Sequence, residues 1–371
     1  MKKVGIITFH ASHNYGSMLQ AYALQQVILN MGYQCEIINF RTEGQKHFYR
    51  PFWRDSRWRL KIKALLYPRI AIDDIRKHRL FEQFLADKLI LSKREFKTGE
   101  ELKTIGLDYD VYISGSDQIW NTICFDFDTA YYLNFVNKGC KIAYSPSMGP
   151  DPSHTMDKSL YPQISNWLNA YDSISVREQA TAQIIKEMTG VAPAVTVDPT
   201  LLLGTEEWNR LVAPQPFING KYILVYSPFV NQELCNEALN IANELDLQII
   251  YTTHDSFRRY HHNPRFKFCL DVGPLEFLNL AKNAMLVVSA SFHAVVFSIM
   301  FGVPFYAFKG MADARVANLL TVTKLERFAE WRLNADLECS SEYVKKGYKW
   351  ITNYRQASLD FLTNSLKKKR Q

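Results

Sequence analysis

Several signals that would assign a function class are missing from this 371-residue sequence. Its six cysteines show no CxxC or Cys/His ligand spacing, which argues against a zinc site and a disulfide framework. It has no GxGxxG fingerprint of a dinucleotide site, and no RNP, helix-turn-helix or zinc-finger pattern. We therefore expect no metal, no cofactor and no nucleic acid among its ligands.

Long apolar runs are also missing. No stretch reaches the roughly 18 apolar residues needed to cross a bilayer, and His10, His13 and Asn14 interrupt the first apolar segment before a signal-peptide core could form. We therefore expect a cytoplasmic protein. A composition with 47% hydrophobic and 22% charged residues is ordinary for a globular protein, and the length favours two domains.

Positive charge is concentrated in one segment. The whole chain has a net charge of +7, yet residues 41–79 alone hold twelve Lys/Arg against four acids, a local charge of +8. The same segment carries six aromatic residues: Phe48, Tyr49, Phe52, Trp53, Trp58 and Tyr67. This mixture suits contact with the inner face of a membrane or with a glycan that carries a lipid phosphate. A solvated insertion of basic helices is the alternative.

Short apolar strands alternate with helical segments along the whole chain. Strands are expected at 4–9, 35–40, 110–114, 141–145, 173–176 and 194–197, then at 222–226, 247–252, 286–289 and 303–308. Such alternation predicts an α/β fold with parallel sheets. We expect a helix at 73–87 followed by a polar connector up to residue 109.

The stretch 204–220 contains two prolines and two glycines and has no sustained periodicity, so we place a domain boundary there. This gives a Rossmann-like domain at 1–210, with the basic insertion 41–79, and a second one at 211–340. We expect residues 341–371 to form a helix, which packs back across both domains, followed by a basic tail.

His293 is the strongest single site signal. It lies where the buried strand 286–289 meets an apolar helix at 294–301, which Gly302 and Pro304 end. In open α/β sheets this junction faces the crevice beyond the carboxyl ends of the strands, where ligands bind, and a helix N-terminus favours anions. A structural histidine beside an apolar helix is the alternative.

Two loops that follow predicted strands carry polar side chains. The loop 10–17 can bind a ligand through N–H groups and side chains, although Gly16 and Ser17 also fit a turn and a helix N-cap. The segment 113–121 combines a carboxylate, amides and an indole, the groups that bind sugar hydroxyls and stack on a pyranose ring. Here, a helix cap at Asp117 and a core position for Trp120 are the alternatives.

Two arginines are candidate anion ligands. Arg177 ends the strand 173–176, and its planar guanidinium matches carboxylate or phosphate oxygens in a bidentate way. Arg315 follows the His293 unit and supplies a second cation near the same crevice. The segment 197–200, which ends the last strand of the first half, is a further signal, although it also fits a helix-stop turn.

Taken together, these segments resemble the polysaccharide pyruvyl transferase family. The matching pieces are HNYGSMLQAYALQ (13–25), ISGSDQIWN (113–121), AYSPSMG (143–149), SVRE (175–178), VDPT (197–200), VGPLEFLNLAKNAMLVVSASFHAVVFSIMFGVPF (272–305) and DARVANLL (313–320). They cover both halves of the chain and are far more specific together than any one alone.

The resemblance implies a two-domain, glycosyltransferase-B-like fold. It also implies an enzyme that transfers pyruvate from phosphoenolpyruvate to two hydroxyls of a sugar, in a surface polysaccharide (capsule or exopolysaccharide) or its lipid-linked precursor, forming a ketal and releasing phosphate. On the same basis His293 lies at the family's catalytic histidine and Arg177 at a donor-binding arginine. Many members carry an arginine two residues before that histidine, where this chain has Ser291.

The chemistry of the donor and acceptor suggests roles for the candidate residues. Phosphoenolpyruvate has a carboxylate and a phosphate, so we expect it to be bound by Arg177, Arg315, Ser291, Asn14, Gly16 and Ser17. We expect His293 to be the general acid and Asp117 to orient or deprotonate the acceptor. The acceptor is expected to contact Tyr15, Gln118, Trp120 and Asn121. The alternatives are a nucleotide-sugar glycosyltransferase on the same scaffold and a catalytically silent glycan-binding protein.

Overall fold

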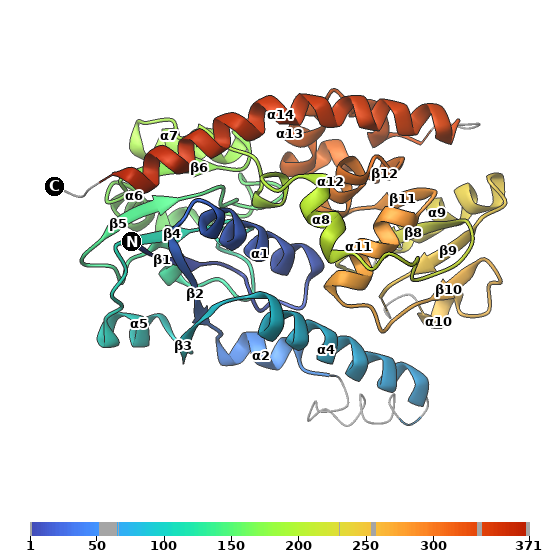
Figure 1. Ribbon diagram of the computed structural model, residues 1–371, viewed down its shortest axis with the longest axis horizontal. Helices are drawn as coiled ribbons and strands as arrows, with labels where there is room; N and C mark the ends of the chain where they lie inside the picture. The colour runs from blue at the N-terminus through green and yellow to red at the C-terminus, as the bar shows by residue number, and fades with distance from the viewer. Residues whose placement is uncertain are drawn as a thin grey trace.

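A computed structural model describes residues 2–51, 65, 67–229, 231–253, 257–331 and 336–368. Part of the expected basic insertion, with Phe52, Trp53 and Trp58, lies outside these residues, as does the end of the basic tail. The described chain forms two parallel β-sheets with helices packed against them (Figure 1). This confirms the expected α/β architecture.

The first sheet has seven strands in the order β3-β2-β1-β4-β5-β6-β7. Its central strand β4 is buried along its whole length, as its apolar sequence predicts for a parallel sheet covered on both faces. The strands are β1 (Lys3–Ile7), β2 (Gln34–Phe40), β3 (Leu91–Phe96), β4 (Val111–Ser114), β5 (Cys140–Ala143), β6 (Ser173–Val176) and β7 (Ala194–Val195).

The second sheet has five strands in the order β10-β9-β8-β11-β12. They are β8 (Tyr222–Tyr226), β9 (Gln248–Tyr251), β10 (Phe266–Phe268), β11 (Leu286–Ser289) and β12 (Phe305–Ala307). The chain therefore passes from one sheet to the other between residues 195 and 222. That passage contains the short helix α8 (Thr205–Leu211), where we expected no regular structure.

Helices connect the strands, and several of them begin at a polar cap. The side chain of Asp313 caps α13 and that of Asp336 caps α14, each accepting a backbone N–H of the first turn. The remaining helices are α1 (Tyr15–Asn30), α2 (Glu43–Tyr49), α4 (Pro68–Lys88), α5 (Gly99–Ile105), α6 (Tyr161–Leu168), α7 (Gln179–Thr189), α9 (Gln232–Glu244), α10 (Phe257–Tyr260), α11 (Pro274–Asn283) and α12 (Phe292–Phe301), with α13 at Ala314–Thr323 and α14 at Leu337–Lys367.

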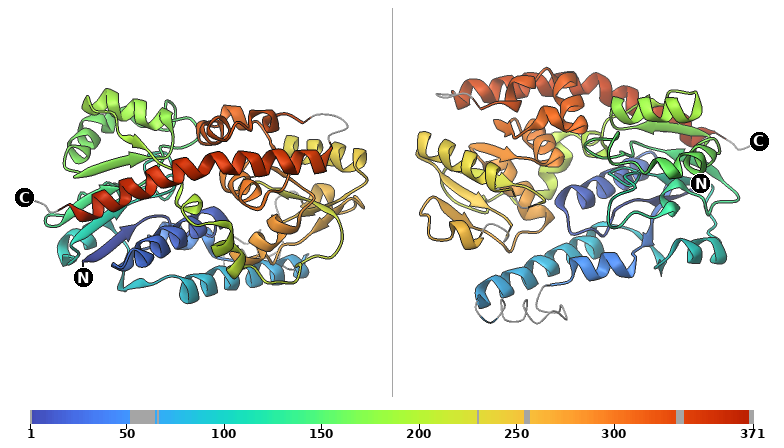
Figure 2. Two further views of the ribbon diagram at one scale, coloured as in Figure 1. Left: turned by 45° about the horizontal axis from the view of Figure 1, so that its top comes forward. Right: turned by 180° about the vertical axis from the view of Figure 1, so that it is seen from behind.

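The last helix, α14, runs across both halves of the molecule (Figures 1 and 2). On the second half it packs against α12 and α13. On the first half the backbone N–H of Val197 donates to Ser358 Oγ of α14, at 3.0 Å. The C-terminal helix thus packs back across both sheets, as predicted from the sequence.

The two halves share one continuous core. The largest apolar cluster includes residues of β1, α1 and β4 as well as of β8, α11 and α12. At its centre the ring of Tyr15 on α1 stacks on Phe277 of α11, with centroids 4.4 Å apart and an interplanar angle of 6°. Such pairs contribute about 0.5–1.5 kcal/mol beyond their buried area, so this stack helps to fix one half against the other.

The connector expected between residues 88 and 109 contains two elements that we did not predict. The strand β3 carries several charged residues and pairs only with β2, at the edge of the sheet. Edge strands lack the long apolar run of a central strand, and charges on them discourage pairing with other chains. After β3 in the sequence, the side chain of Thr98 caps the short helix α5.

The described part of the basic insertion contacts the second half of the chain. The helix α4 lies beneath both halves in Figure 1 and packs against α11. Lys77 Nζ donates to the backbone oxygen of Thr252 at 3.2 Å, and Arg76 lies 3.7 Å from Asp271. Among the described residues, no helix combines the length and the apolar character needed to cross a bilayer.

Candidate active site

The loops that follow strands β1 and β11 meet between the two sheets. The contact is closest at Gly16, where a Cβ atom would lie 2.0 Å from Nδ1 of His293. Real Cβ atoms essentially never come so close to another heavy atom, so only glycine fits here unless the imidazole moves. Gly16 therefore supports the ring of His293.

His293 lies in the first turn of α12. The helix begins at Phe292, two residues earlier than expected, and Ser291 is its N-cap. The residue is only 7% exposed, and its Nε2 has no hydrogen-bond partner among the described residues. The nearest charged group is Asp198, whose Oδ2 is 3.5 Å from Nε2. A buried polar nitrogen without a partner is costly, and such atoms are frequent at functional sites.

Asp198 also binds Arg177. Nη1 of Arg177 donates to Oδ2 of Asp198 at 2.9 Å, and both side chains are almost fully buried. Burial alone would raise the pKa of Asp198, but its contacts with His293 and Arg177 outweigh this and hold the pKa well below its usual value. Asp198 is therefore ionised at neutral pH and links the arginine to the histidine.

Arg177 has hydrogen-bonding capacity left over. In the part of the chain that the structure describes, its Nε and Nη2 make no hydrogen bond, although the residue is 3% exposed. The carboxylate of Glu178 lies 3.6 Å from Nε, and the ring of Phe292 lies 4.6 Å from the guanidinium carbon. Burial raises the pKa of Glu178, which makes it a weaker counter-ion than Asp198. The free N–H groups are available to an anionic ligand.

Asp117 lies on the other side of Arg177. Its Oδ1 is 3.9 Å from Nη1 of Arg177, and its Oδ2 accepts a 2.5 Å hydrogen bond from Ser17 Oγ. The residue has a φ of 71°, a left-handed conformation that is uncommon outside glycine but tolerated by Asp in tight turns. The hydrogen bond between Ser17 and Asp117 thus joins the loop after β1 to the loop after β4, next to the guanidinium of Arg177.

Arg315 differs from the expectation that it is a free second cation. Its Nε donates to Asp313 Oδ1 at 2.9 Å and its Nη2 to Asp313 Oδ2 at 2.5 Å, so the guanidinium is already paired in a bidentate way. The two residues are two apart in the sequence, and Asp313 is also the N-cap of α13. Arg315 therefore has fewer unbonded N–H groups to offer a ligand than Arg177.

The site residues surround two cavities and not the single crevice that we expected. The larger cavity, of about 610 Å³, is lined by His293, Ser291, Asn14, Ser17, Asp117, Gln118 and Asn121 among others. The smaller one, of about 230 Å³, is lined by Arg177 and Asp198. Phe292 and Arg315 line both cavities and lie between them. The arginine and the histidine therefore face different spaces on either side of this boundary.

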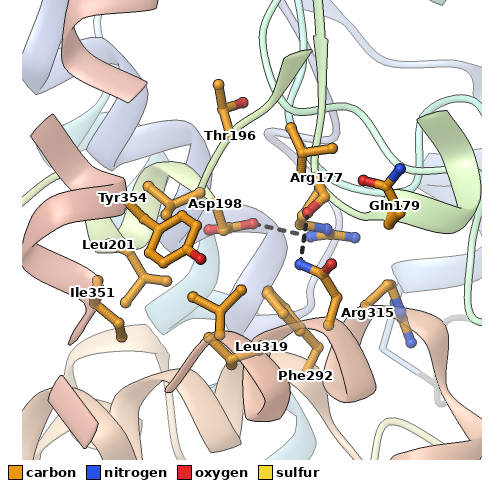
Figure 3. A pocket seen from close by; sticks show the side chains of 14 residues that line it. Arg177, Gln179, Thr196, Asp198, Leu201, Phe292, Arg315, Leu319, Ile351 and Tyr354 are labelled. Atoms are coloured by element: carbon orange, nitrogen blue, oxygen red, sulfur yellow. Dashed lines mark hydrogen bonds and ion pairs between the residues drawn. The ribbon is translucent and has the colours of Figure 1, made fainter. Parts of the chain in front are cut away.

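Figure 3 shows the smaller cavity from close by. Arg177 and Asp198 meet at its centre, and Phe292 lies next to them. The opposite walls are apolar side chains from α13 and α14, namely Leu319 and Ile351, together with Tyr354. These walls exclude water from around the guanidinium, which strengthens its attraction for an anion.

Two predicted acceptor residues do not reach either cavity. Trp120 is fully buried, stacks on Tyr132 with centroids 5.0 Å apart, and donates Nε1–H to the backbone oxygen of Tyr131. Tyr15 is 1% exposed, and its hydroxyl donates to the backbone oxygen of Val272. Both side chains pack the core, which corrects the acceptor contact that we expected for them.

The loop 10–17 also differs in detail from the expectation. Asn14, and not Ser17, is the N-cap of α1, because its Oδ1 accepts the backbone N–H groups of Gly16 and Ser17. Asn14 and Ser17 still line the larger cavity, whereas Gly16 is covered by His293. The other two predicted acceptor residues, Gln118 and Asn121, line that cavity and are bonded to each other at 3.3 Å.

Two further carboxylates line the cavities, and the sequence analysis assigned no role to either. The segment 197–200, which contains Asp198, was a moderate signal because it also fits a turn. Asp126 lines the larger cavity, and burial raises its pKa to about 6. Its position in a polar loop carried no signal in the sequence.

One cluster outside the cavities has metal-ligand character. Candidate ligand atoms of His13, His78 and Glu82 lie within 4.8 Å of one another. However, Arg41 donates to both carboxylate oxygens of Glu82, at 2.8 and 3.1 Å, and so already supplies the positive charge that the carboxylate needs. We assign no metal to this cluster.

Comparisons with solved structures place the fold among known ones. The chain is similar to the Staphylococcus aureus MnaA–UDP co-structure, with a TM-score of 0.58, 12% identity, and coverage of 100% of this chain and 99% of the other. It is also similar to UDP-GlcNAc 2-epimerase from Methanocaldococcus jannaschii (TM-score 0.51, 13% identity, 91% and 94% covered). A third is Anabaena Alr3699/HepE in complex with UDP and glucose (TM-score 0.51, 11% identity, 99% and 98% covered).

These similarities confirm the glycosyltransferase-B-like arrangement of two Rossmann-like units, and at such low identity they establish the fold alone. No curated protein sequence matches the chain. The sequence profile described as polysaccharide pyruvyl transferase, in contrast, matches residues 14–309, which include Asp117, Arg177, Asp198 and His293 but not Arg315. The chain therefore belongs to the polysaccharide pyruvyl transferase family.

Proposed function

We propose that this protein transfers pyruvate from phosphoenolpyruvate to two hydroxyls of a sugar, forming a cyclic ketal and releasing phosphate. One observation carries the proposal: Arg177 and His293 flank the same carboxylate, Asp198, and each retains buried nitrogens without a hydrogen-bond partner among the described residues. Membership of the family supports the same reaction.

The donor would bind at the boundary between the two cavities. Phosphoenolpyruvate carries a phosphate and a carboxylate, and the unbonded N–H groups of Arg177 offer a charge-assisted contact to one of them. The first turn of α12 supplies a favourable dipole for the other. Ser291 contributes no cation at this point, so the donor would depend more strongly on Arg177.

The reaction assigns a proton transfer to His293. The first sugar hydroxyl adds to C2 of the donor while its methylene carbon C3 gains a proton and becomes a methyl group. The second hydroxyl then adds to C2 as the bond from C2 to the phosphate oxygen breaks. Of the two hydroxyl protons, one balances the new methyl C–H bond and one leaves with the phosphate. We assign His293 as the general acid at C3, with the negative charge of Asp198, whose Oδ2 lies 3.5 Å from Nε2, stabilising the protonated ring.

The larger cavity would hold the acceptor. Its polar lining of carboxylate, amide and hydroxyl groups from Asp117, Gln118 and Ser17 suits a sugar. At its rim the apolar side chains of Ile123, Phe125 and Phe229 are 63%, 55% and 75% exposed. Exposed aromatic rings can pack on further sugar units, so we propose a glycan as the acceptor.

A lipid-linked acceptor extends this proposal. Tyr49 of α2 lines the larger cavity and lies in the segment 41–79, whose net charge is +8. A basic segment beside the cavity suits the phosphates of a lipid-linked glycan at the inner face of a membrane. Part of this segment lies outside the described residues.

The test is to incubate the protein with phosphoenolpyruvate and acceptor glycans and to follow phosphate release together with the methyl NMR signal of the ketal. We expect both signals to appear in equal amounts and only with acceptor present. Turnover of a nucleotide sugar without use of phosphoenolpyruvate would instead indicate a glycosyltransferase. Binding of glycan without any turnover would indicate a catalytically silent protein.

A further inference from the structure

Asp126 is a buried carboxylate with only neutral hydrogen-bond donors around it. It is 5% exposed, and its Oδ2 accepts from Ser12 Oγ at 3.4 Å and from Gln45 Nε2 at 3.3 Å. Across the described ranges, no Lys, Arg or His forms an ion pair with it. A buried carboxylate without a cation is costly to the fold, so a role in the site is the more economical explanation.

The position of Asp126 in the larger cavity indicates what this role is. Asp126 lines the same cavity as Asp117 and His293. Burial, together with the negative charge of Asp117, raises the pKa of Asp126 to about 6. A group with such a pKa can both accept and release a proton near neutral pH.

The other titratable groups that face Asp126 do not compete for this role. Tyr49, Cys124 and Tyr131 interact with its charge, and burial raises the pKa of each of the three. They are therefore neutral at neutral pH and do not exchange protons with an acceptor hydroxyl there. Asp117 and Asp126 are the two carboxylates that line the cavity wall on the side of the first sheet.

Ketal formation requires two hydroxyl groups to lose a proton, one after the other. Asp117 lies beside Arg177, next to the groups that would act when the first hydroxyl adds and C3 is protonated. We propose that Asp126 is the base for the second hydroxyl, an inference that rests on the proposed pyruvyl transfer. As this O–H bond breaks, the oxygen bonds to C2 and the phosphate departs with its bonding electron pair. Asp126 then passes the proton to the phosphate or to solvent.

The two additions can be measured separately. We expect the first addition to be reversible, so that in D2O it introduces deuterium at C3 of the recovered phosphoenolpyruvate. The second addition releases phosphate. For Asp126→Asn we expect acceptor-dependent deuterium exchange to persist, while phosphate release falls by about 10²- to 10⁴-fold, the usual contribution of a general base. Asp108→Asn, at an exposed carboxylate away from both cavities, is the matched control and should change neither rate.

The outcomes discriminate clearly. If exchange and release fall together, or if neither falls, the role of Asp126 is overturned. If the unchanged protein forms no ketal at all, the proposed function fails before the variant is considered. Should Asp126→Asn not fold, the pH profile of the unchanged protein decides: kcat for phosphate release should fall as the pH drops below about 6. A flat profile between pH 5 and pH 7 would contradict the inference.

Discussion

The two cavities differ in the chemistry that they present. The smaller one has the guanidinium groups of Arg177 and Arg315, a carboxylate and largely apolar walls, whereas the larger one shares Arg315 but adds carboxylates, amides, hydroxyls and an imidazole. The smaller therefore suits a compact anion that is shielded from water, and the larger suits a neutral, hydroxyl-rich molecule. A donor and an acceptor of such different polarity would each be recognised by its own set of loops.

The boundary between the cavities shows how the two sets of loops are coupled. Asp198 contacts Arg177 on one side and His293 on the other, and Phe292 covers the guanidinium and lines both cavities. Because α12 begins at Phe292, the same helix start positions the boundary and the imidazole. A substitution in one cavity should thus affect the other chiefly through these residues.

The largest expected effect is the loss of His293. His293→Gln keeps a polar side chain of similar reach but removes the titrating ring, so ketal formation should fall by about 10²- to 10⁴-fold. Donor binding, which we assign mainly to Arg177, should change little. Phosphate release and the ketal methyl signal measure the first expectation, and calorimetry with phosphoenolpyruvate measures the second. Turnover at the normal rate would remove the histidine from the mechanism.

A substitution at Gly16 should misplace the same ring without changing its chemistry. The added Cβ of Gly16→Ala would lie 2.0 Å from Nδ1 of His293, so the imidazole must move. A displacement of about 1 Å can reduce turnover by roughly 10²-fold. Gly44→Ala is the control, because the nearest atom to its Cβ would be 3.8 Å away. Equal turnover in both variants would show that the position of the ring is not critical.

Arg177→Lys addresses the smaller cavity. Lysine retains the charge but not the planar fork, so the affinity for phosphoenolpyruvate should fall by about 10- to 100-fold, the value of one charge-assisted hydrogen bond. Acceptor affinity should be unchanged. Arg327→Lys, at an exposed arginine that lines neither cavity, is the control. A fall in acceptor affinity alone would reverse the assignment of the two cavities.

The smallest effect is expected at the rim of the larger cavity. Phe125→Ala removes a 55% exposed ring and should raise KM for a glycan acceptor by about 2- to 10-fold, without changing donor binding. Phe217→Ala, at a 43% exposed ring outside this cavity, provides the comparison. An equal KM in the two variants would exclude the rim from acceptor binding.

Sequence reasoning located the loops of the site better than the contacts within it. His293 could be placed at the start of a helix after a buried strand, because the apolar strand, the small residues and the closing Gly302 are local signals. The partnership of Asp198 with Arg177 and His293 could not be predicted, since it joins residues 21 and 95 positions apart through folding alone. No local pattern reports such a contact.

Burial was the other property that the sequence did not reveal. The side chain of Trp120 could serve either the core or a sugar, and it serves the core because Tyr132 and the backbone of Tyr131 complete its contacts. Arg315 could be free or paired, and it is paired because Asp313 lies on the same turn. The local sequence allows either role for each residue, and the contact with a neighbouring side chain, Tyr132 for Trp120 and Asp313 for Arg315, determines which one it has.

The most direct test of the account is a structure of the protein with phosphoenolpyruvate bound. We predict that the donor lies at the boundary of the two cavities, with one of its anionic groups within hydrogen-bond distance of Arg177 Nη2 or Nε and with C3 facing His293. A donor bound elsewhere in the larger cavity, out of reach of Arg177, would contradict the account.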